Sequence, residues 1–202
     1  MRRYHHHHLV LLACLLCLAA AASPSAAVAP AVAVDFVRRS CRSTEYPRVC
    51  ESTLVPCAPA VGRSPRRLAR AALVVGADRA RNCSAYIRGG GAPEVAAGKK
   101  GGAMRDCAEL ARDAEERLRQ SAAEMERMGR AGTPRFAWAL SNVQTWASAA
   151  LTDTSTCLDS LAQEKPKDRD AVRRRVVAVA EATSNALALV NRLHPAQHRR
   201  LL

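Results

Sequence analysis

The chain has 202 residues, of which 49% are hydrophobic and 3% aromatic, and its formal net charge is +13. This length is enough for one domain with a sizeable core. Scattered basic residues with few aromatic ones disfavour a nucleic-acid-binding protein, and no later segment approaches the 18 apolar residues that a membrane-spanning helix needs. The excess positive charge either favours anionic surroundings or serves solubility.

The N-terminus resembles a secretory signal peptide. Arg2 and Arg3 precede a 14-residue apolar run, Leu9 to Ala22, which is followed by small residues. This run is short for a membrane span, so we assign residues 1–22 to a signal peptide, with cleavage after Ala33 as a second choice. The histidines at positions 5–8 leave with this peptide, and no metal site is predicted from them.

Secretion makes disulfide bonds the expected state of the cysteines. Removal of the signal peptide leaves six of the eight, at positions 41, 50, 57, 83, 107 and 157. Six cysteines allow 15 pairings, and the sequence alone does not choose among them.

The remaining chain is predicted to be all-α, because alanine and leucine dominate and strand-like alternation is absent. Residues 33–55 are expected to form a helical hairpin that turns near residues 44–47. Ser64 and Pro65 resemble an N-cap followed by proline at the first helical position, which starts a helix over about 65–88. Residues 89–102 contain six glycines and predict a mobile connection.

Three more long helices follow. The second covers about 103–129, Thr133 and Pro134 start the third, and Asp168 or Asp170 starts the fourth. The predicted core stripe of the second helix is Ala103, Cys107, Leu110, Ala114, Leu118, Ser121, Met125 and Met128. That of the fourth is Val172, Val176, Val179, Thr183, Ala186, Leu187, Val190 and Leu193. Residues 33–193 are therefore expected to form an up-down-up-down four-helix bundle after the N-terminal hairpin, with a basic tail at 194–202.

No catalytic constellation is apparent. After the signal peptide the only histidines are His194 and His198, beyond the last core position, and neither a nucleophile with a base nor a phosphate loop occurs. We therefore predict a protein that is not an enzyme and that needs no cofactor or metal.

The outer face of the third helix is the candidate contact surface. Phe136, Leu140, Val143, Ala147, Ala150 and Thr154 share its inner face. The outer face carries Trp138, Ser141, Thr145, Ser148 and Thr152, with Asn142 and Ala149 alongside. These residues either form a partner-binding site with Trp138 as its anchor, or Trp138 lies under the N-terminal hairpin and the polar residues face water. Trp146 is expected at the core margin.

Asn82-Cys83-Ser84 is a glycosylation sequon. The central cysteine and the helical setting both count against modification. A glycan on Asn82 would exclude that face of the first long helix from a partner interface.

Four segments carry a family resemblance: Cys41-Arg-Ser-Thr-Glu-Tyr-Pro-Arg-Val-Cys50, Met104-Arg-Asp-Cys107-Ala-Glu-Leu, Ser141 to Cys157, and Thr183-Ser-Asn-Ala-Leu-Ala-Leu189. Together they resemble the plant pectin methylesterase inhibitors, a family that also includes the invertase inhibitors. The likeness extends over about residues 35–193.

The resemblance implies disulfides between Cys41 and Cys50 and between Cys107 and Cys157. Cys57 and Cys83 lie outside the shared pairs, and we expect them to be free thiols. The implied function is that of a secreted inhibitor in the apoplast or cell wall. It would cover the pectin-binding cleft of a pectin methylesterase in a non-covalent one-to-one complex, mainly through the second and third long helices. The positive charge adds anionic, demethylated pectin as a second candidate partner.

The nearest alternative is an invertase inhibitor on the same fold. Pro134-Arg135-Phe136 resembles the Pro-Lys-Phe motif of that subfamily, with arginine in place of lysine. Two features count against it. The segment Trp146-Ala-Ser-Ala-Ala-Leu-Thr152 resembles the pattern of the pectin methylesterase inhibitors, and Phe136 fits the inner, core-facing side of the helix. Another alternative is the related domain that forms the N-terminal pro-region of pectin methylesterases. That alternative would need a catalytic domain after Leu202. A secreted lipid carrier would need adjacent cysteines and a Cys-x-Cys, which the sequence lacks.

Overall fold

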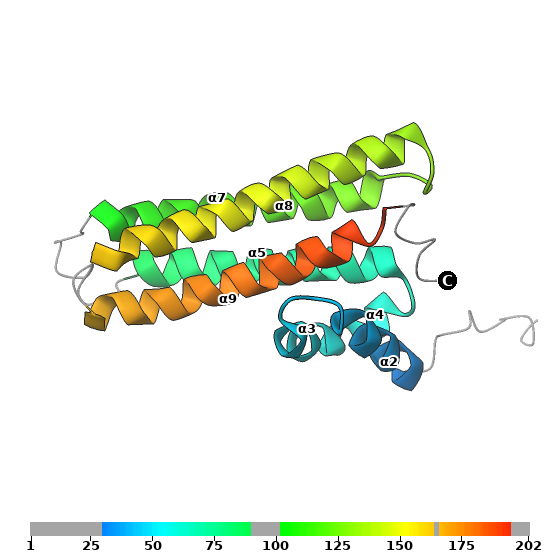
Figure 1. Cartoon of the computed structure of the whole chain (residues 1–202), viewed down its shortest axis with the longest axis horizontal. Coiled ribbons are helices and arrows are strands. Elements are labelled where there is room, and N and C mark those ends of the chain that lie inside the picture. The colour runs from blue at the N-terminus through cyan, green and yellow to red at the C-terminus, as the bar shows by residue number, and fades with distance from the viewer. Residues whose placement is uncertain (1–29, 90–101, 164–165, 195–202) are drawn as a thin grey trace, which may run out of the picture.

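The computed structural model describes residues 30–89, 102–163 and 166–194 (Figure 1). The assigned signal peptide, most of the glycine-rich connection and the tail beyond residue 194 lie outside the described residues. Every regular element in the described part is a helix, which confirms the all-α fold class.

Four long helices form the body of the molecule. They are α5 (Pro65–Arg88), α7 (Gly102–Arg127), α8 (Pro134–Ser160) and α9 (Pro166–Asn191). Successive helices run in alternating directions in Figure 1. α5 packs against α7 and α9, and α8 packs against the same two helices, so α5 and α8 lie diagonally across the bundle.

The predicted helix starts follow local chemistry. The Ser64 hydroxyl accepts a hydrogen bond from the Arg67 amide at 3.3 Å, and the Thr133 hydroxyl accepts one from the Phe136 amide at 3.2 Å. Both caps precede a proline at the first helical turn, where the missing amide hydrogen costs nothing. α9 starts at Pro166, slightly earlier than the two aspartates predicted, and proline is tolerated in the first turn of a helix.

The N-terminal part is longer than the predicted hairpin. α2 (Pro30–Cys41) and α3 (Pro47–Leu54) form the expected pair. Two further turns follow, η2 (Val55–Cys57) and α4 (Ala58–Val61). The prediction missed them because prolines interrupt this stretch, yet each proline lies in the first turn of its helix and is tolerated there.

The core consists of small and branched apolar side chains. Most of the predicted stripe on α7 is buried, but Ala103 and Leu110 are only half-buried, as are Leu187 and Leu193 of the predicted stripe on α9. The prediction placed these four residues on the buried face, whereas they lie at the edges of helix contacts. The largest fully buried side chains of the four long helices and their connections are Leu68, Leu73, Ile87, Leu118, Met125, Met128, Leu140, Val143 and Leu161.

Two disulfides link neighbouring helices, as the resemblance implied. Cys41–Cys50 joins α2 to α3 with a Cα–Cα distance of 5.5 Å, and Cys107–Cys157 joins α7 to α8 at 4.8 Å. Cys57 and Cys83 are free thiols, the first half-buried and the second buried.

The N-terminal helices attach to α5 and α9. Asn185 on α9, which is 2% exposed, makes the central contact: its Oδ1 accepts from the Tyr46 amide and its Nδ2 donates to the Tyr46 carbonyl, both at 3.0 Å. Arg192 donates to the Ser40 carbonyl at 3.1 Å. Figure 1 accordingly shows α2, α3 and α4 beside α9, away from α7 and α8.

Candidate protein-binding face

The helix α8 is nearly free of charge. Between Phe136 and Leu158 its only charged residue is Asp153. By contrast, exposed positions of the neighbouring α7 include Arg112, Glu116 and Arg119. The inner face of α8 is buried as predicted, so its uncharged outer side chains are the ones that meet the surroundings.

The five predicted contact residues are all exposed: Trp138, Ser141, Thr145, Ser148 and Thr152. We call this set the polar face of α8. Their spacing of three, four, three and four residues aligns them on one side of the helix over about 21 Å at 1.5 Å per residue. Trp138 is 67% exposed. The alternative that it lies under the N-terminal hairpin is therefore wrong, because the hairpin attaches to the other side of the bundle.

Several hydroxyls at the C-terminal part of this face bond to their own helix. The Thr152 hydroxyl donates to the Ser148 carbonyl at 3.2 Å, and the Thr156 hydroxyl donates to the Thr152 carbonyl at 3.0 Å. Each hydroxyl has one hydrogen to donate and two lone pairs. Because the hydrogen is used inside the helix, the outward oxygen is available to a partner that donates hydrogen bonds.

The single carboxylate of this stretch is neutralised by α7. Arg117 Nε donates to Asp153 Oδ2 at 2.9 Å, and the Asp153 side chain is 13% exposed. Burial raises the pKa of Asp153, and the hydrogen bond and charge of Arg117 lower it. The net shift is upward, so desolvation outweighs pairing. The pair joins α7 to α8 beside Thr152 and leaves no net charge there.

Other residues named with this face are less accessible. Asn142, Ala149 and Trp146 are half-buried, which agrees with the core-margin position expected for Trp146. Ser155 and Thr156 are exposed and extend the uncharged surface toward the C-terminus of α8. These two residues were not predicted as contact residues, although the hydroxyl-rich run from Thr152 to Thr156 indicates them.

Asn82 is exposed on α5, on the side that faces α9. Its helical neighbours on that side are Arg79, which donates to the Ala178 carbonyl of α9 at 2.8 Å, and Tyr86, over whose ring Arg175 lies at 3.4 Å. The sequon therefore lies far from the polar face of α8, which is diagonal to α5.

Within the described ranges, no group of three or more His, Cys, Asp or Glu side chains could hold a metal ion. The search for membrane spans, limited to the same residues, finds no helix with the length and hydropathy to cross a bilayer.

The fold and its bridges define a disulfide-linked four-helix bundle with an N-terminal helical hairpin. The chain belongs to the plant invertase/pectin methylesterase inhibitor family, whose match covers residues 35–189. This is a family of inhibitors and not of enzymes.

Similarity to individual proteins supports the assignment. The chain is 39% identical to the 21 kDa protein of Daucus carota over 168 residues, 82% of this chain and 87% of that protein. It is 38% identical to pectinesterase inhibitor 11 of Arabidopsis thaliana over 172 residues, 84% of this chain and 85% of that protein. A crystal structure of a mutant form of an Arabidopsis pectin methylesterase inhibitor shares the fold, with a TM-score of 0.58 at 19% identity over 75% of this chain and 92% of that chain.

Proposed function

We propose that this protein is a secreted inhibitor of plant pectin methylesterase. It forms a non-covalent one-to-one complex that covers the pectin-binding cleft of the enzyme and so limits de-esterification of pectin in the cell wall. Its relatives named as pectinesterase inhibitors match nearly the whole domain. The protein acts by obstruction and forms no covalent bond with the enzyme.

The polar face of α8 is the observation that carries this proposal. Small uncharged side chains permit close approach, and their burial avoids the desolvation cost of unpaired ions. An exposed tryptophan at one end is the type of residue that most often anchors an interface. A partner that presents hydrogen-bond donors would find acceptors along this face.

The face is also held in place before binding. The Cys107–Cys157 disulfide and the Arg117–Asp153 pair both tie α8 to α7. A surface that is rigid before association loses little conformational entropy on docking, so the whole length of α8 can act as one contact element.

The structure weighs against the invertase alternative. Phe136 is 5% exposed, and Arg135 Nε donates to the Arg127 carbonyl at 3.1 Å. Two residues of the motif that resembles Pro-Lys-Phe are thus engaged within the molecule, one of them in the core. The pectin enzyme remains the better candidate.

The cell wall is the proposed location, reached through the N-terminal signal peptide. The positive charge of the chain would favour demethylated pectin there. A glycan on Asn82, where the sequon is used, would extend from the α5–α9 side and leave the polar face of α8 accessible.

Inhibition assays test the proposal directly. Purified protein should inhibit pectin methylesterase and leave invertase unaffected. Thr145→Glu and Thr152→Lys should each weaken inhibition by about tenfold or more, because a charge must be desolvated in an uncharged contact. Trp138→Ala should cost about 2 kcal/mol, roughly thirtyfold in the inhibition constant.

Matched controls place the same charges elsewhere. Ser52→Glu on α3 and Ala85→Lys on α5 alter exposed positions away from α8 and should leave inhibition unchanged. Normal inhibition by the Thr145 and Thr152 variants would remove α8 from the interface, and invertase inhibition by the native protein would favour the alternative.

A further inference from the structure

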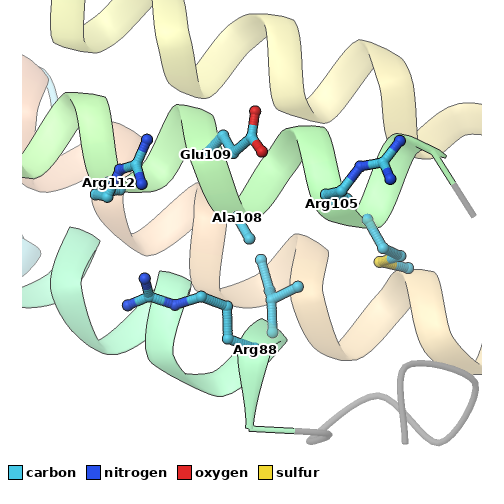
Figure 2. Close-up of a pocket in the computed structure, with 7 residues that line it drawn as sticks. Arg88, Arg105, Ala108, Glu109 and Arg112 are labelled. Atoms are coloured by element: carbon cyan, nitrogen blue, oxygen red, sulfur yellow. The ribbon is translucent and has the colours of Figure 1, made fainter. Parts of the chain in front are cut away.

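A hollow of about 160 Å³ lies between the end of α5 and the start of α7 (Figure 2). Its floor is made of the apolar side chains of Ile87, Met104 and Ala108, which are almost fully covered at 1%, 3% and 6% exposed. Its rim is charged, with three arginines and one glutamate: Arg88, Arg105, Arg112 and Glu109. A rim with three arginines suits a ligand that carries negative charge.

The three guanidinium groups are weakly engaged. Arg88 Nη2 lies 3.5 Å from the Ser84 hydroxyl, and Arg112 Nη2 lies 3.8 Å from Asp113. Arg105 makes no ion pair with any residue in the described part of the chain. These arginines are therefore available to an external anion, because contacts of this length contribute little.

Glu109 lies between Arg105 and Arg112 on α7 (Figure 2). In Figure 2, Arg105 and Arg112 extend from α7 on either side of Ala108, and Arg88 extends from α5 below. The carboxylate of Glu109 points away from Arg88. Arg105 and Arg112 are seven residues apart, about 10.5 Å along the helix axis, so they can bind carboxylates on separate units of a chain.

We propose that this hollow binds a carboxylated sugar chain, the demethylated form of pectin. Arginine forks match carboxylates in two-pronged hydrogen bonds, and a carboxylated sugar chain presents several carboxylates along its length. Nucleic acid fits less well, because the site offers no aromatic ring on which a base can stack.

This inference rests on the proposed function for its choice of ligand and adds a localising role to it. Pectin methylesterase produces free carboxylates, so an inhibitor that binds them is retained where the enzyme has already acted. The hollow lies on the α5 side of α7, away from the polar face of α8. Sugar binding and enzyme binding can then take place on one molecule at the same time.

The test is calorimetric titration of the purified full-length protein with oligogalacturonate, in the absence of any esterase. The triple variant Arg88→Gln, Arg105→Gln, Arg112→Gln should lower the affinity by about tenfold or more. A control triple variant, Arg42→Gln, Arg48→Gln, Arg63→Gln, removes the same charge from exposed positions near the N-terminal helices. It should change affinity by less than about threefold. The fully methyl-esterified oligomer should not bind.

Three outcomes would overturn the site: no oligogalacturonate binding by the native protein, equal losses in both triple variants, or unchanged binding after loss of the three rim arginines. Thermal unfolding of each variant establishes that it is folded. Because esterase inhibition is measured separately, a native protein that binds the oligomer without inhibiting the enzyme contradicts only the proposed function. One that inhibits without binding contradicts only the hollow.

Discussion

At the scale of single residues, the two free cysteines differ in environment. Cys83 is 1% exposed and lines a small internal space with Thr154 and Cys157, whereas Cys57 is half-buried. Burial raises the pKa of Cys83 to about 11, although the charge of Arg175 opposes the shift. The Cys83 thiol therefore stays protonated and unreactive beside the Cys107–Cys157 bridge at neutral pH.

This raised pKa makes stability depend on alkaline pH. In the unfolded chain Cys83 loses its proton near pH 9.0 and in the folded protein near 11. The contribution of Cys83 to the free energy of unfolding is complete below pH 9 and is lost as the pH rises toward 11. Between pH 8 and pH 10 the free energy of unfolding should fall by about 1 kcal/mol through this group. Urea denaturation at the two pH values measures the change.

The control is the same experiment on two variants. Cys83→Ala should show a smaller fall between pH 8 and pH 10, and Cys57→Ala should behave as the native protein does. If the fall is the same in the Cys83 variant, burial of this thiol has no part in the alkaline sensitivity.

At the scale of elements, α7 and α8 form a linked pair. The disulfide joins them near the start of α7 and the end of α8, and the Arg117–Asp153 pair joins them again one to two turns toward the middle of α8. Asp153 is desolvated enough that its pKa is raised even with Arg117 in place. The ionised form of the Asp153 carboxylate is therefore stabilised by Arg117.

Removal of that partner should be costly at neutral pH and less so in acid. Arg117→Ala leaves an unpaired carboxylate in a mostly buried position, which should lower the free energy of unfolding by about 1–2 kcal/mol at pH 7. The pKa of Asp153 then rises further, so protonation at pH 4 removes the unfavourable charge and part of the loss is recovered. Chemical denaturation at both pH values measures the difference.

Two further variants identify the cause. With Asp153→Asn already present, Arg117→Ala should cost the same at pH 7 and pH 4. Arg112→Ala, an exposed arginine on the same helix, should have little effect at either pH. A loss for Arg117→Ala that grows in acid would show that the Asp153 charge is not its origin.

At the scale of the whole molecule, the attachment of the N-terminal helices decides which bundle face is accessible. Asn185 bonds both backbone groups of Tyr46, 139 residues earlier in the chain. It thereby holds α3 on the α9 side. The α8 side remains uncovered, and the polar face of α8 becomes available to a partner.

Asn185→Ala should loosen this attachment without changing α8. The loss of two hydrogen bonds in a mostly buried contact should lower the free energy of unfolding by about 2 kcal/mol, while inhibition of pectin methylesterase remains unchanged. Ser184→Ala, which removes an exposed hydrogen bond to Glu45, should cost less than about 0.5 kcal/mol. Equal losses in the two variants, by thermal unfolding, would contradict a special role for Asn185.

The four long helices and most of their inner faces could be predicted from the sequence. Proline with a preceding Ser or Thr marked the starts of α5 and α8, and the spacing of Phe136, Leu140 and Val143 assigned the inner face of α8. These signals work because caps and helical periodicity depend on residues a few positions apart. The disulfide pairing came from resemblance to a family, since spacing alone left 15 possibilities.

The neighbours of each helix face depend on the tertiary structure. Whether Trp138 is covered depends on where the hairpin attaches, and that depends on Asn185 meeting Tyr46. The Arg117–Asp153 pair and the arginine-rimmed hollow likewise join residues from different helices. No local pattern reports such pairings, because they arise only when the packing of the core brings distant parts of the chain together.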